Sequence, residues 1–299
     1  MIYLFSFAGI SIRCEIPFSI SIGRESEPFL IQEQNSADLI FRFIPVKELI
    51  LPRRSGVWQV DSCYYGGRDG YTVYHCPVRG KPPYAKVSWN RQEPNLLLCH
   101  YTEGEEKSFS YSQSVLNFMG LESIFLQNRT LLLHSSFIKG GSSAILFSAP
   151  SGTGKSTQAE LWKQYENTDI INGDRAAIKR TEKGWTAWGL PYAGSSGIYR
   201  NECAKIAAIV VLRQGKENTI RQLGPAEAIR YLYPELMIHH WEPDFVNAAL
   251  NLLQELIFDV SVFLLSCLPD RNAVQLLKET LMERGHLDDS DSSGACNNG

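Results

Sequence analysis

The sequence predicts an α/β protein with two domains. The N-terminal domain is β-rich, and the second domain has a mixed sheet and a glycine-rich turn of the phosphate-binding type (a P-loop). Two observations predict this organisation. Residues 1–110 consist of short runs that alternate apolar and polar residues between turn formers, as β-sheets do. After residue 130 strands alternate with helices, and a glycine-rich stretch, 147–157, joins a buried strand to a helix. At 299 residues the chain is long enough for two modest domains.

The composition is that of an ordinary globular protein. Hydrophobic residues make up 44%, charged residues 20%, and the net charge is −3, a balance that favours neither nucleic acid nor an anionic membrane as a partner. Seven cysteines occur without a CxxC pair, which disfavours a disulfide framework and a zinc site. No apolar run has the length of a membrane span, and the first residues alternate like strands rather than like a signal peptide. We therefore expect a cytoplasmic protein.

The N-terminal domain, 1–110, is predicted to be an antiparallel sheet or sandwich. Its expected strands are IYLFSFAGI, FLIQEQ, DLIFRFIPV, WQVDSCYY, YTVYHCPV, AKVSWN and NLLLCHYT. The region is rich in Tyr, Trp and Phe. These rings favour cross-strand packing, and an aromatic surface for a docked peptide is the alternative.

The second domain is predicted over 111–285. A helix over 112–127, capped by Ser112 or Ser114, leads into it. The following elements are two strands within 129–149, a helix at 157–165, a strand and acidic turn at 169–174, hairpins around Gly184 and Gly215, helices at 224–233 and 243–258, a strand at 260–268 and a closing helix capped by Asp270. The last residues, 286–299, are polar and acidic, and we expect them to be a disordered tail.

The stretch from Ala149 to Ser156 has the pattern of a phosphate-binding loop with Ala in place of the first Gly. Backbone N–H groups of such a turn, and the N-terminus of the next helix, bind an anion with several oxygens. Gly152 and Gly154 permit positive φ, Lys155 is expected to reach the terminal phosphates, and the Ser156 hydroxyl to contact Mg²⁺. The predicted nucleotide-binding residues are Ser151, Gly152, Thr153, Gly154, Lys155, Ser156 and Thr157, although Thr157 also fits an ordinary helix position.

Three more residues are expected to act with this loop. Asp174 closes the run DIIN one helix and one strand after Ser156, where a carboxylate for Mg²⁺ is needed. His134 ends the run TLLLH, and we expect its strand to bring it to the same end of the sheet as the loop. Arg200 ends a second Gly-Ser loop, 193–201, which is predicted to close over a substrate with Arg200 at the transferred phosphate.

Other polar residues have less informative spacing. Arg175, next to the acidic turn, has two equal interpretations, a phosphate ligand or the partner of an acid. The remaining candidates are interpreted as surface residues: His239, His240, Glu235 and Asp244.

Taken together, these residues resemble the catalytic domain of HPr kinase/phosphorylase, a relative of ATP-dependent phosphoenolpyruvate carboxykinase. The resemblance covers roughly 128–285 and rests on LLLHSSFI, AILFSAPSGTGKSTQAELW and DIINGDRAAI. The NGDR turn and the GSSGIYRN loop look most like the HPr-kinase-like proteins encoded with ribosomally made peptides. Those include kinases that phosphorylate a serine of a lasso-peptide precursor.

The resemblance implies a P-loop-containing mixed-sheet kinase domain that uses ATP and Mg²⁺. Lys155 would hold ATP phosphates, Ser156 and Asp174 would serve Mg²⁺, and His134 would sit near the acceptor. The family's acidic turn typically carries two adjacent aspartates, one of which acts as base on the acceptor serine, but here the first position is Gly173. The proton acceptor is therefore open between Asp174 and His134, and the reverse, phosphorylase reaction is open as well.

The function predicted from the sequence is transfer of the γ-phosphoryl group of ATP to a serine of a peptide or protein, with a ribosomally made lasso-peptide precursor as the suggested acceptor. Two alternatives stay open: a kinase of a small hydroxylated metabolite such as free serine, and a non-catalytic nucleotide-binding regulatory module. The loop recognises phosphates and not the base, so the donor is specified only as a triphosphate, and diphosphate is compatible with it. Members of the family are often hexameric, so a homo-oligomer is compatible with the resemblance.

Overall fold

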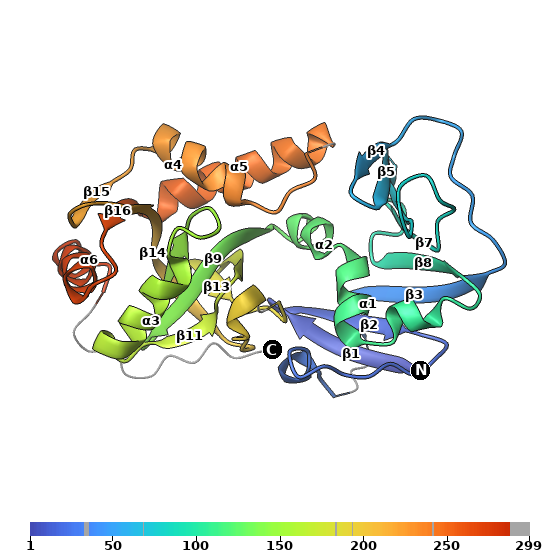
Figure 1. Cartoon of the computed structure of the whole chain (residues 1–299), viewed down its shortest axis with the longest axis horizontal. Helices are drawn as coiled ribbons and strands as arrows, with labels where there is room; N and C mark the ends of the chain where they lie inside the picture. The colour runs from blue at the N-terminus through green and yellow to red at the C-terminus, as the bar shows by residue number, and fades with distance from the viewer. Residues whose placement is uncertain (33–35, 68, 183, 193, 241, 288–299) are drawn as a thin grey trace. The chain divides into compact units, whose positions relative to one another are not determined.

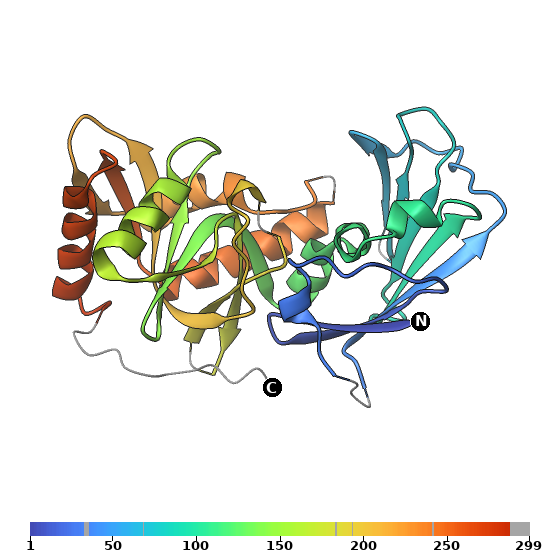
Figure 2. The ribbon, with the colours of Figure 1, turned by 60° about the horizontal axis from the view of Figure 1, so that its bottom comes forward.

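The computed structural model describes residues 1–32, 36–67, 69–182, 184–192, 194–240 and 242–287, and it divides the chain into two compact units, each with its own sheet (Figures 1 and 2). Unit 1 comprises Met1–Leu121 and His240–Pro243, and unit 2 comprises Glu122–His239 and Asp244–Gly299. Among the described residues, no helix is long and apolar enough to cross a membrane. The tail predicted for 286–299 lies outside the described residues from position 288 onward.

Unit 1 is built on an eight-stranded mixed sheet in the order β1-β2-β3-β8-β7-β6-β5-β4. Two of its pairs, β2–β3 and β3–β8, are parallel and the others are antiparallel, so the purely antiparallel prediction is wrong. The strands are β1 Ile2–Phe7, β2 Ile10–Glu15, β3 Leu39–Val46, β4 Val57–Gln59, β5 Ser62–Gly67, β6 Gly70–His75, β7 Ala85–Asn90 and β8 Leu96–Thr102.

Within the described part of FLIQEQ, residues 29–32, no continuous strand forms. The chain instead makes a 3₁₀ turn, η1, at Glu27–Phe29, with a proline in its first positions, and Leu30 contributes only an isolated bridge to Phe5. Proline fixes φ in the range of such a turn and removes an N–H that a sheet would need, which explains the difference.

Aromatic side chains from the sheet of unit 1 pack against aromatic side chains of η2 and α1. The Phe109 ring, in η2 (Glu106–Phe109), lies 5.2 Å from Phe43, 5.7 Å from Tyr101 and 4.8 Å from Phe118 by ring centroids. Such edge-to-face contacts are favourable aromatic geometry. Cross-strand and core packing, the first of the two interpretations of these rings, is therefore confirmed for this cluster.

The helix predicted over 112–127 is two helices, α1 (Ser112–Met119) and α2 (Leu121–Gln127). Gly120 between them is left-handed, with φ 63°, and a glycine in this conformation ends a helix. Neither predicted serine caps α1: Tyr111 is at the N-cap without a side-chain bond, and the Ser112 hydroxyl instead donates to the Ser26 hydroxyl at 2.9 Å. The α1 helix belongs to unit 1, whose first segment ends at Leu121.

Unit 2 is built on a second eight-stranded mixed sheet, in the order β10-β9-β12-β13-β14-β16-β15, with β11 beside β9. Since β10 pairs with β9 on one side and with β14 on the other, the strands β10, β9, β12, β13 and β14 form a closed ring of pairings. The strands are β9 Thr130–Gly140, β10 Ser143–Ser148, β11 Asp169–Asn172, β12 Arg175–Thr181, β13 Gly184–Trp188, β14 Cys203–Gln214, β15 Thr219–Gln222 and β16 Val262–Cys267.

Helices bury both faces of this sheet. On one side α4 (Pro225–Leu232) and α5 (Pro243–Asp259) contribute core residues such as Leu232 and Leu252. On the other side α3 (Lys155–Glu166) and α6 (Arg271–Glu283) contribute Trp162 and Leu277 (Figure 1). The predicted cap of α6 is confirmed, because the Asp270 carboxylate accepts from the Ala273 N–H at 3.0 Å.

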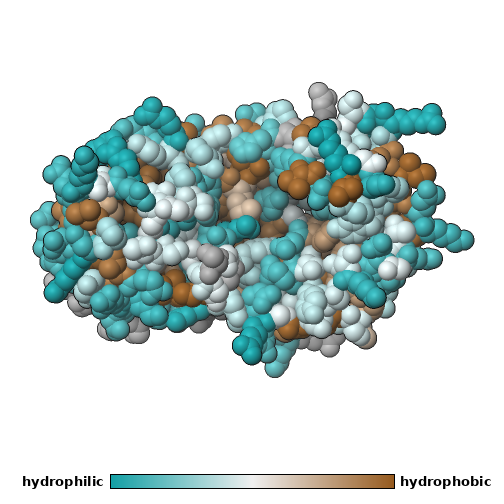
Figure 3. Space-filling view, viewed as in Figure 1, coloured by the Kyte–Doolittle hydropathy of each residue, from teal (hydrophilic) through white to brown (hydrophobic). Residues whose placement is uncertain are grey.

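On the face drawn in Figure 3, hydrophobic residues occur in small groups. The face in Figure 3 is mostly hydrophilic or neutral, with hydrophobic residues scattered over it. The most exposed large apolar side chains are single ones, Phe258 at 90% and Val60 at 86%. Scattered exposure of this kind is normal for a folded protein.

Candidate functional site

A glycine-rich turn, residues 149–154, joins β10 to α3, so the strand–turn–helix context predicted for it is confirmed. Gly152 and Gly154 have φ of 78° and 117°, and a Cβ on either would meet nothing within 4 Å. The backbone conformation, and not crowding, therefore requires glycine. The Gln158 N–H donates to the Gly154 carbonyl at 3.0 Å as the first bond of α3, so the N–H groups of the three residues before Gln158 have no intrahelical acceptor. Such groups at a helix N-terminus favour an anion.

Lys155 is the buried cation of this turn, with 7% of its surface exposed. Its ammonium group donates to the carbonyl oxygens of Ala149, at 2.7 Å, and Pro150, at 3.4 Å. Burial lowers the pKa of Lys155, and the negative charges of Glu235 and Asp174 oppose that shift. Two carboxylates thus lie within electrostatic reach of the lysine. Of the other predicted nucleotide ligands, four are exposed and two are half-buried: Ser151, Gly152, Ser156 and Thr157 in the first group, and Thr153 and Gly154 in the second.

Strand β9 brings His134 beside the glycine-rich turn. β10 ends at Ser148, opposite Ser135, and the Ser148 hydroxyl donates to the His134 carbonyl at 3.1 Å. The expectation that His134 reaches the same end as the turn is confirmed. However, His134 does not end its strand, which continues to Gly140. The neighbouring strand changes at this point, because β12 pairs with β9 up to His134 and β11 pairs with β9 from Phe137 onward.

The acidic turn between β11 and β12 pairs with β9 at Ser135 and Ser136, between the two strands. The Ser135 N–H donates to the Asp174 carbonyl at 3.0 Å, and the Ser136 hydroxyl donates to the Gly173 carbonyl at 3.1 Å. Asp174 therefore meets β9 from the side opposite β10. The tertiary structure thus assembles His134, Asp174 and the glycine-rich turn from three separate parts of the chain.

A buried asparagine that the sequence analysis did not single out shapes the acidic turn. The Asn172 side-chain oxygen accepts from the N–H groups of Asp174 and Arg175, both at 2.9 Å, while its amide nitrogen donates to the carbonyls of Leu190 and Tyr192, both at 2.8 Å. Asparagine is favoured where its side chain bonds the backbone two residues on. The Asn-Gly pair in NGDR was the available signal.

Asp174 lies between a histidine and an arginine. Its Oδ1 is 3.9 Å from His134 Nε2, and its Oδ2 accepts from Arg175 Nε at 3.0 Å. Of the two interpretations of Arg175, the structure therefore shows the acid pair. The Arg175 guanidinium also lies over the Tyr192 ring, 5.2 Å from its centroid. Burial, with the charge of Glu122, raises the pKa of Tyr192, so this hydroxyl is neutral at pH 7.

Glu235 is the functional candidate that sequence reasoning missed. The structure places it against His134, with Oε2 2.7 Å from Nδ1, although 101 positions separate the two residues. Its side chain is 10% exposed. The surface interpretation of Glu235 is therefore wrong, and no local pattern could have corrected it because the contact depends on how the turn after α4 meets β9.

The surface interpretation of His239 is wrong too. This residue is 7% exposed, and its ring nitrogens lie 3.3 Å from the Ser123 hydroxyl and 3.0 Å from a Glu122 oxygen. Burial opposes ionisation of Glu122, but the hydrogen bond and charge of His239, with Arg175, lower the pKa of Glu122 overall. His240 and Asp244 are exposed, as expected.

The structure does not bring Arg200 to this group. The last part of the Gly-Ser loop lies antiparallel to β11, with Tyr199 bridged to Asn172, and Arg200 pairs with Asp169 at the start of that strand. Arg200 Nη1 lies 2.9 Å from Asp169 Oδ1. The expectation that Arg200 meets a transferred phosphate has no support in this geometry.

The first residues of the same loop do contact the acidic turn. A Cβ on Gly194 would lie 2.7 Å from the Asp174 carboxyl carbon, and a Cβ on Gly173 would lie 2.2 Å from the Ser196 hydroxyl. The loop therefore packs directly on the turn that carries Asp174. The crowding at Gly173 is a physical reason for glycine at the position where the family resemblance expects a second aspartate.

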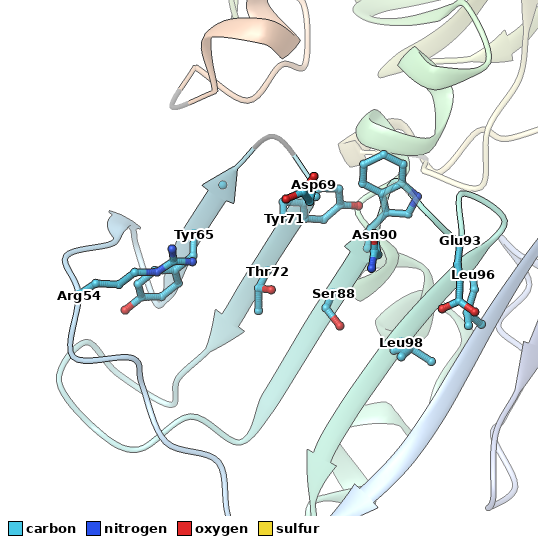
Figure 4. A pocket seen from close by; sticks show the side chains of 13 residues that line it. Arg54, Tyr65, Asp69, Tyr71, Thr72, Ser88, Asn90, Glu93, Leu96 and Leu98 are labelled. Carbon is cyan, nitrogen blue, oxygen red and sulfur yellow. The ribbon is translucent and has the colours of Figure 1, made fainter.

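A separate pocket, of about 440 Å³, lies on the sheet of unit 1 (Figure 4). Tyr65, Thr72, Ser88 and Leu98 are register neighbours across β5 to β8, so their side chains share one face, as Figure 4 shows. The lining mixes polar, apolar and aromatic groups. The peptide-docking interpretation of the aromatic N-terminal region would apply here, and it stays a prediction.

Comparisons with known proteins add little to these observations. No protein-family model matches the chain, and no curated protein matches it in sequence. Among solved structures, the HPr(Ser) kinase/phosphatase from Coxiella burnetii is similar over 52% of this chain and 89% of that one, at 14% identity and a TM-score of 0.31. It belongs to the family that the loop residues resemble, but a TM-score of this size does not establish a shared fold. We therefore assign neither fold nor function from it.

Proposed function

We propose that this protein is a kinase that transfers the terminal phosphoryl group of ATP to a serine hydroxyl of a peptide or protein. The observation that carries the proposal is the convergence of a glycine-rich turn containing Lys155, the Asp174 turn and His134 at one edge of the unit 2 sheet. In phosphoryl transfer, a lysine at a helix N-terminus and a carboxylate that holds a metal ion position phosphates and neutralise their charge, and a carboxylate or histidine can accept the hydroxyl proton.

The residues present fit a nucleotide with Mg²⁺. The turn offers positive-φ glycines and helix N–H groups for phosphate oxygens, and Lys155 is close at its base. No cluster of three or more His, Cys, Asp or Glu able to hold a metal occurs in the described part of the chain. That agrees with Mg²⁺, which is usually held by one or two carboxylates together with substrate phosphates. Ser156 and Asp174 would be its protein ligands, and the ion would neutralise charge on the phosphates.

In the proposed reaction, the serine oxygen forms a bond to the γ-phosphorus while the bond between that phosphorus and the β–γ bridging oxygen breaks. The electron pair of the broken bond leaves with ADP, and the hydroxyl proton passes to a neighbouring base. Asp174 and His134 are the two candidates, since they lie 3.9 Å apart at the same edge. A base in this position contributes about 10²–10⁴-fold to the rate.

The acceptor class is the finer part of the proposal. A serine in a ribosomally made peptide precursor, of the lasso type, is supported by the resemblance of the NGDR turn and the GSSGIYRN loop to the kinases of such peptides. The pocket on the unit 1 sheet offers a surface of suitable chemistry for a peptide segment. Free serine and other small hydroxylated metabolites are the competing acceptors in the experiment.

The decisive experiment is a transfer assay with γ-labelled ATP and Mg²⁺. One acceptor panel contains serine peptides, including precursor peptides encoded beside the gene, and the other contains free serine and hydroxylated metabolites. We expect label on a peptide, and we expect Lys155→Ala and Asp174→Ala each to lower the rate by at least about 10²-fold. Matched controls are Lys163→Ala, an exposed lysine on the same helix, and Asp169→Asn, at the other end of β11.

The outcomes separate the alternatives. Label only on a small molecule would replace the peptide acceptor with a metabolite. Nucleotide binding without any transfer would point to a regulatory module. A near-normal rate for Asp174→Ala would contradict the assignment of metal binding to that residue.

A further inference from the structure

We propose that Glu235 is a positioning residue for His134: its carboxylate accepts a hydrogen bond from Nδ1–H and so leaves the Nε2 lone pair facing the Asp174 side of the site. The inference rests on the proposed phosphoryl transfer for its role in the reaction, but its structural part can be tested without it. It begins from the 2.7 Å contact between Glu235 Oε2 and His134 Nδ1.

The backbone holds Glu235 opposite His134. Leu133 and Leu236 form an antiparallel bridge, and the Met237 N–H donates to the Leu132 carbonyl at 3.0 Å. In that register the residues next to the bridge, His134 and Glu235, face each other. Directly opposed antiparallel residues have their Cβ atoms about 4.5–5.5 Å apart. The backbone pairing of the two segments therefore places the Glu235 carboxylate beside His134.

The ends of this short pairing are fixed as well. Glu235 closes a 3₁₀ turn, η4 (Tyr233–Glu235), in which the Leu236 N–H donates to the Tyr233 carbonyl at 3.2 Å. Leu232 and Leu236, on either side of the turn, are buried in the core at 0% and 5% exposure. A carboxylate on such an anchored turn has little freedom to leave its partner.

The chemistry of the contact determines which ring nitrogen carries the proton. A carboxylate only accepts hydrogen bonds, so the proton of a neutral imidazole that faces it is on Nδ1, and Nε2 is then an acceptor. Nε2 is the atom that lies 3.9 Å from Asp174 Oδ1. In the neutral ring, Glu235 thus directs the Nε2 lone pair toward the Asp174 side of the site.

The acidic turn cannot supply this second carboxylate itself. At Gly173 any side chain would start 2.2 Å from the Ser196 hydroxyl and 2.5 Å from its Cβ. Asp174, the remaining carboxylate of the turn, pairs with Arg175 at 3.0 Å. Glu235 reaches the site from the opposite side of β9 and supplies the carboxylate that the turn lacks.

The primary test observes the histidine directly. The protein is labelled with ¹⁵N-histidine, and ring nitrogen shifts are recorded by long-range ¹H–¹⁵N correlation for wild type, Glu235→Gln, Glu235→Asp and Glu235→Ala. His134→Gln identifies the His134 signals, and Glu227→Gln, a half-buried glutamate on α4 that pairs with Arg221, is the matched control. With spectra recorded at a pH at which the ring is neutral, we expect the Nδ1–H tautomer in wild type, a mixture in Glu235→Ala, and recovery toward wild type in Glu235→Asp. An unchanged tautomer in Glu235→Ala overturns the proposal.

Transfer kinetics give the second readout. The negative charge of Glu235 acts on Lys155, so its removal should leave ATP affinity equal or higher while kcat falls by about 10–100-fold, less than the about 10²–10⁴-fold expected when a base itself is lost. A loss of ATP affinity and kcat together would indicate a merely structural role and overturn the proposal. If no acceptor is ever phosphorylated, the kinase proposal fails, while the tautomer and ATP-affinity measurements still decide the role of Glu235.

Discussion

Replacing Gly173 by alanine should destabilise unit 2 through a single identifiable contact. The added methyl carbon would lie 2.2 Å from the Ser196 hydroxyl and 2.5 Å from the Ser196 Cβ, well inside contact distance. The φ of Gly173 is outside the left-handed range, so alanine itself is not strained there. Any cost therefore comes from crowding against Ser196.

The magnitude follows from two opposing terms. Overpacking a buried site costs about 1–3 kcal/mol, while replacing glycine by alanine at a compatible φ contributes about 0.4–1 kcal/mol by restricting the unfolded chain. We expect a net loss of about 1–2 kcal/mol for Gly173→Ala. When Ser196→Gly removes the crowding atoms, the nearest remaining atom of that residue is its Cα at 4.0 Å, so alanine should then be neutral or slightly stabilising.

The assay is a double-mutant cycle of these two substitutions, measured by urea unfolding. Hydrogen exchange of peptides from β9 and β11 assigns the change to unit 2. The loop should also shift over Asp174, and a misplacement of about 1 Å near reacting groups costs up to about 10²-fold in rate. An unfolding free energy equal to wild type, or an equal loss with and without Ser196, would refute the packing argument.

Three further predictions concern other parts of the chain. His75 is neutral in the fold because burial lowers its pKa to about 4. As pH falls from about 6.5 to about 4, the unfolded chain therefore binds a proton at His75 that the native state does not bind. The free energy of unfolding should drop by up to about 3 kcal/mol across that window. Unfolding curves measured at a series of pH values should show a smaller drop for His75→Gln. Arg200→Ala should change phosphoryl transfer less than about threefold, because the guanidinium pairs with Asp169, and a loss above about tenfold would restore its catalytic role. Gly120→Ala should cost about 1 kcal/mol at its φ of 63°, whereas Gly224→Ala should cost less, because any residue adopts its φ of −72°; equal melting shifts would contradict this.

Local sequence patterns predicted the local parts of the site well. The strand–turn–helix around Lys155 and the acidic turn at Asp174 both form where expected. Predictions failed where a neighbour distant in sequence decides the outcome. An example is the purely antiparallel arrangement of the first sheet, which contains two parallel pairs.

The sequence by itself determined that this protein has a glycine-rich turn between a buried strand and a helix, with an aspartate one helix and one strand later. Glycine conformations, helix starts and strand alternation depend on adjacent residues, so they can be inferred from a short window. Only the tertiary structure decided that Glu235 pairs with His134, that Arg200 lies at Asp169, and that Ser196 leaves no room for a side chain at Gly173. These outcomes depend on sheet register, and a one-residue change of register would place different side chains together without altering any local pattern.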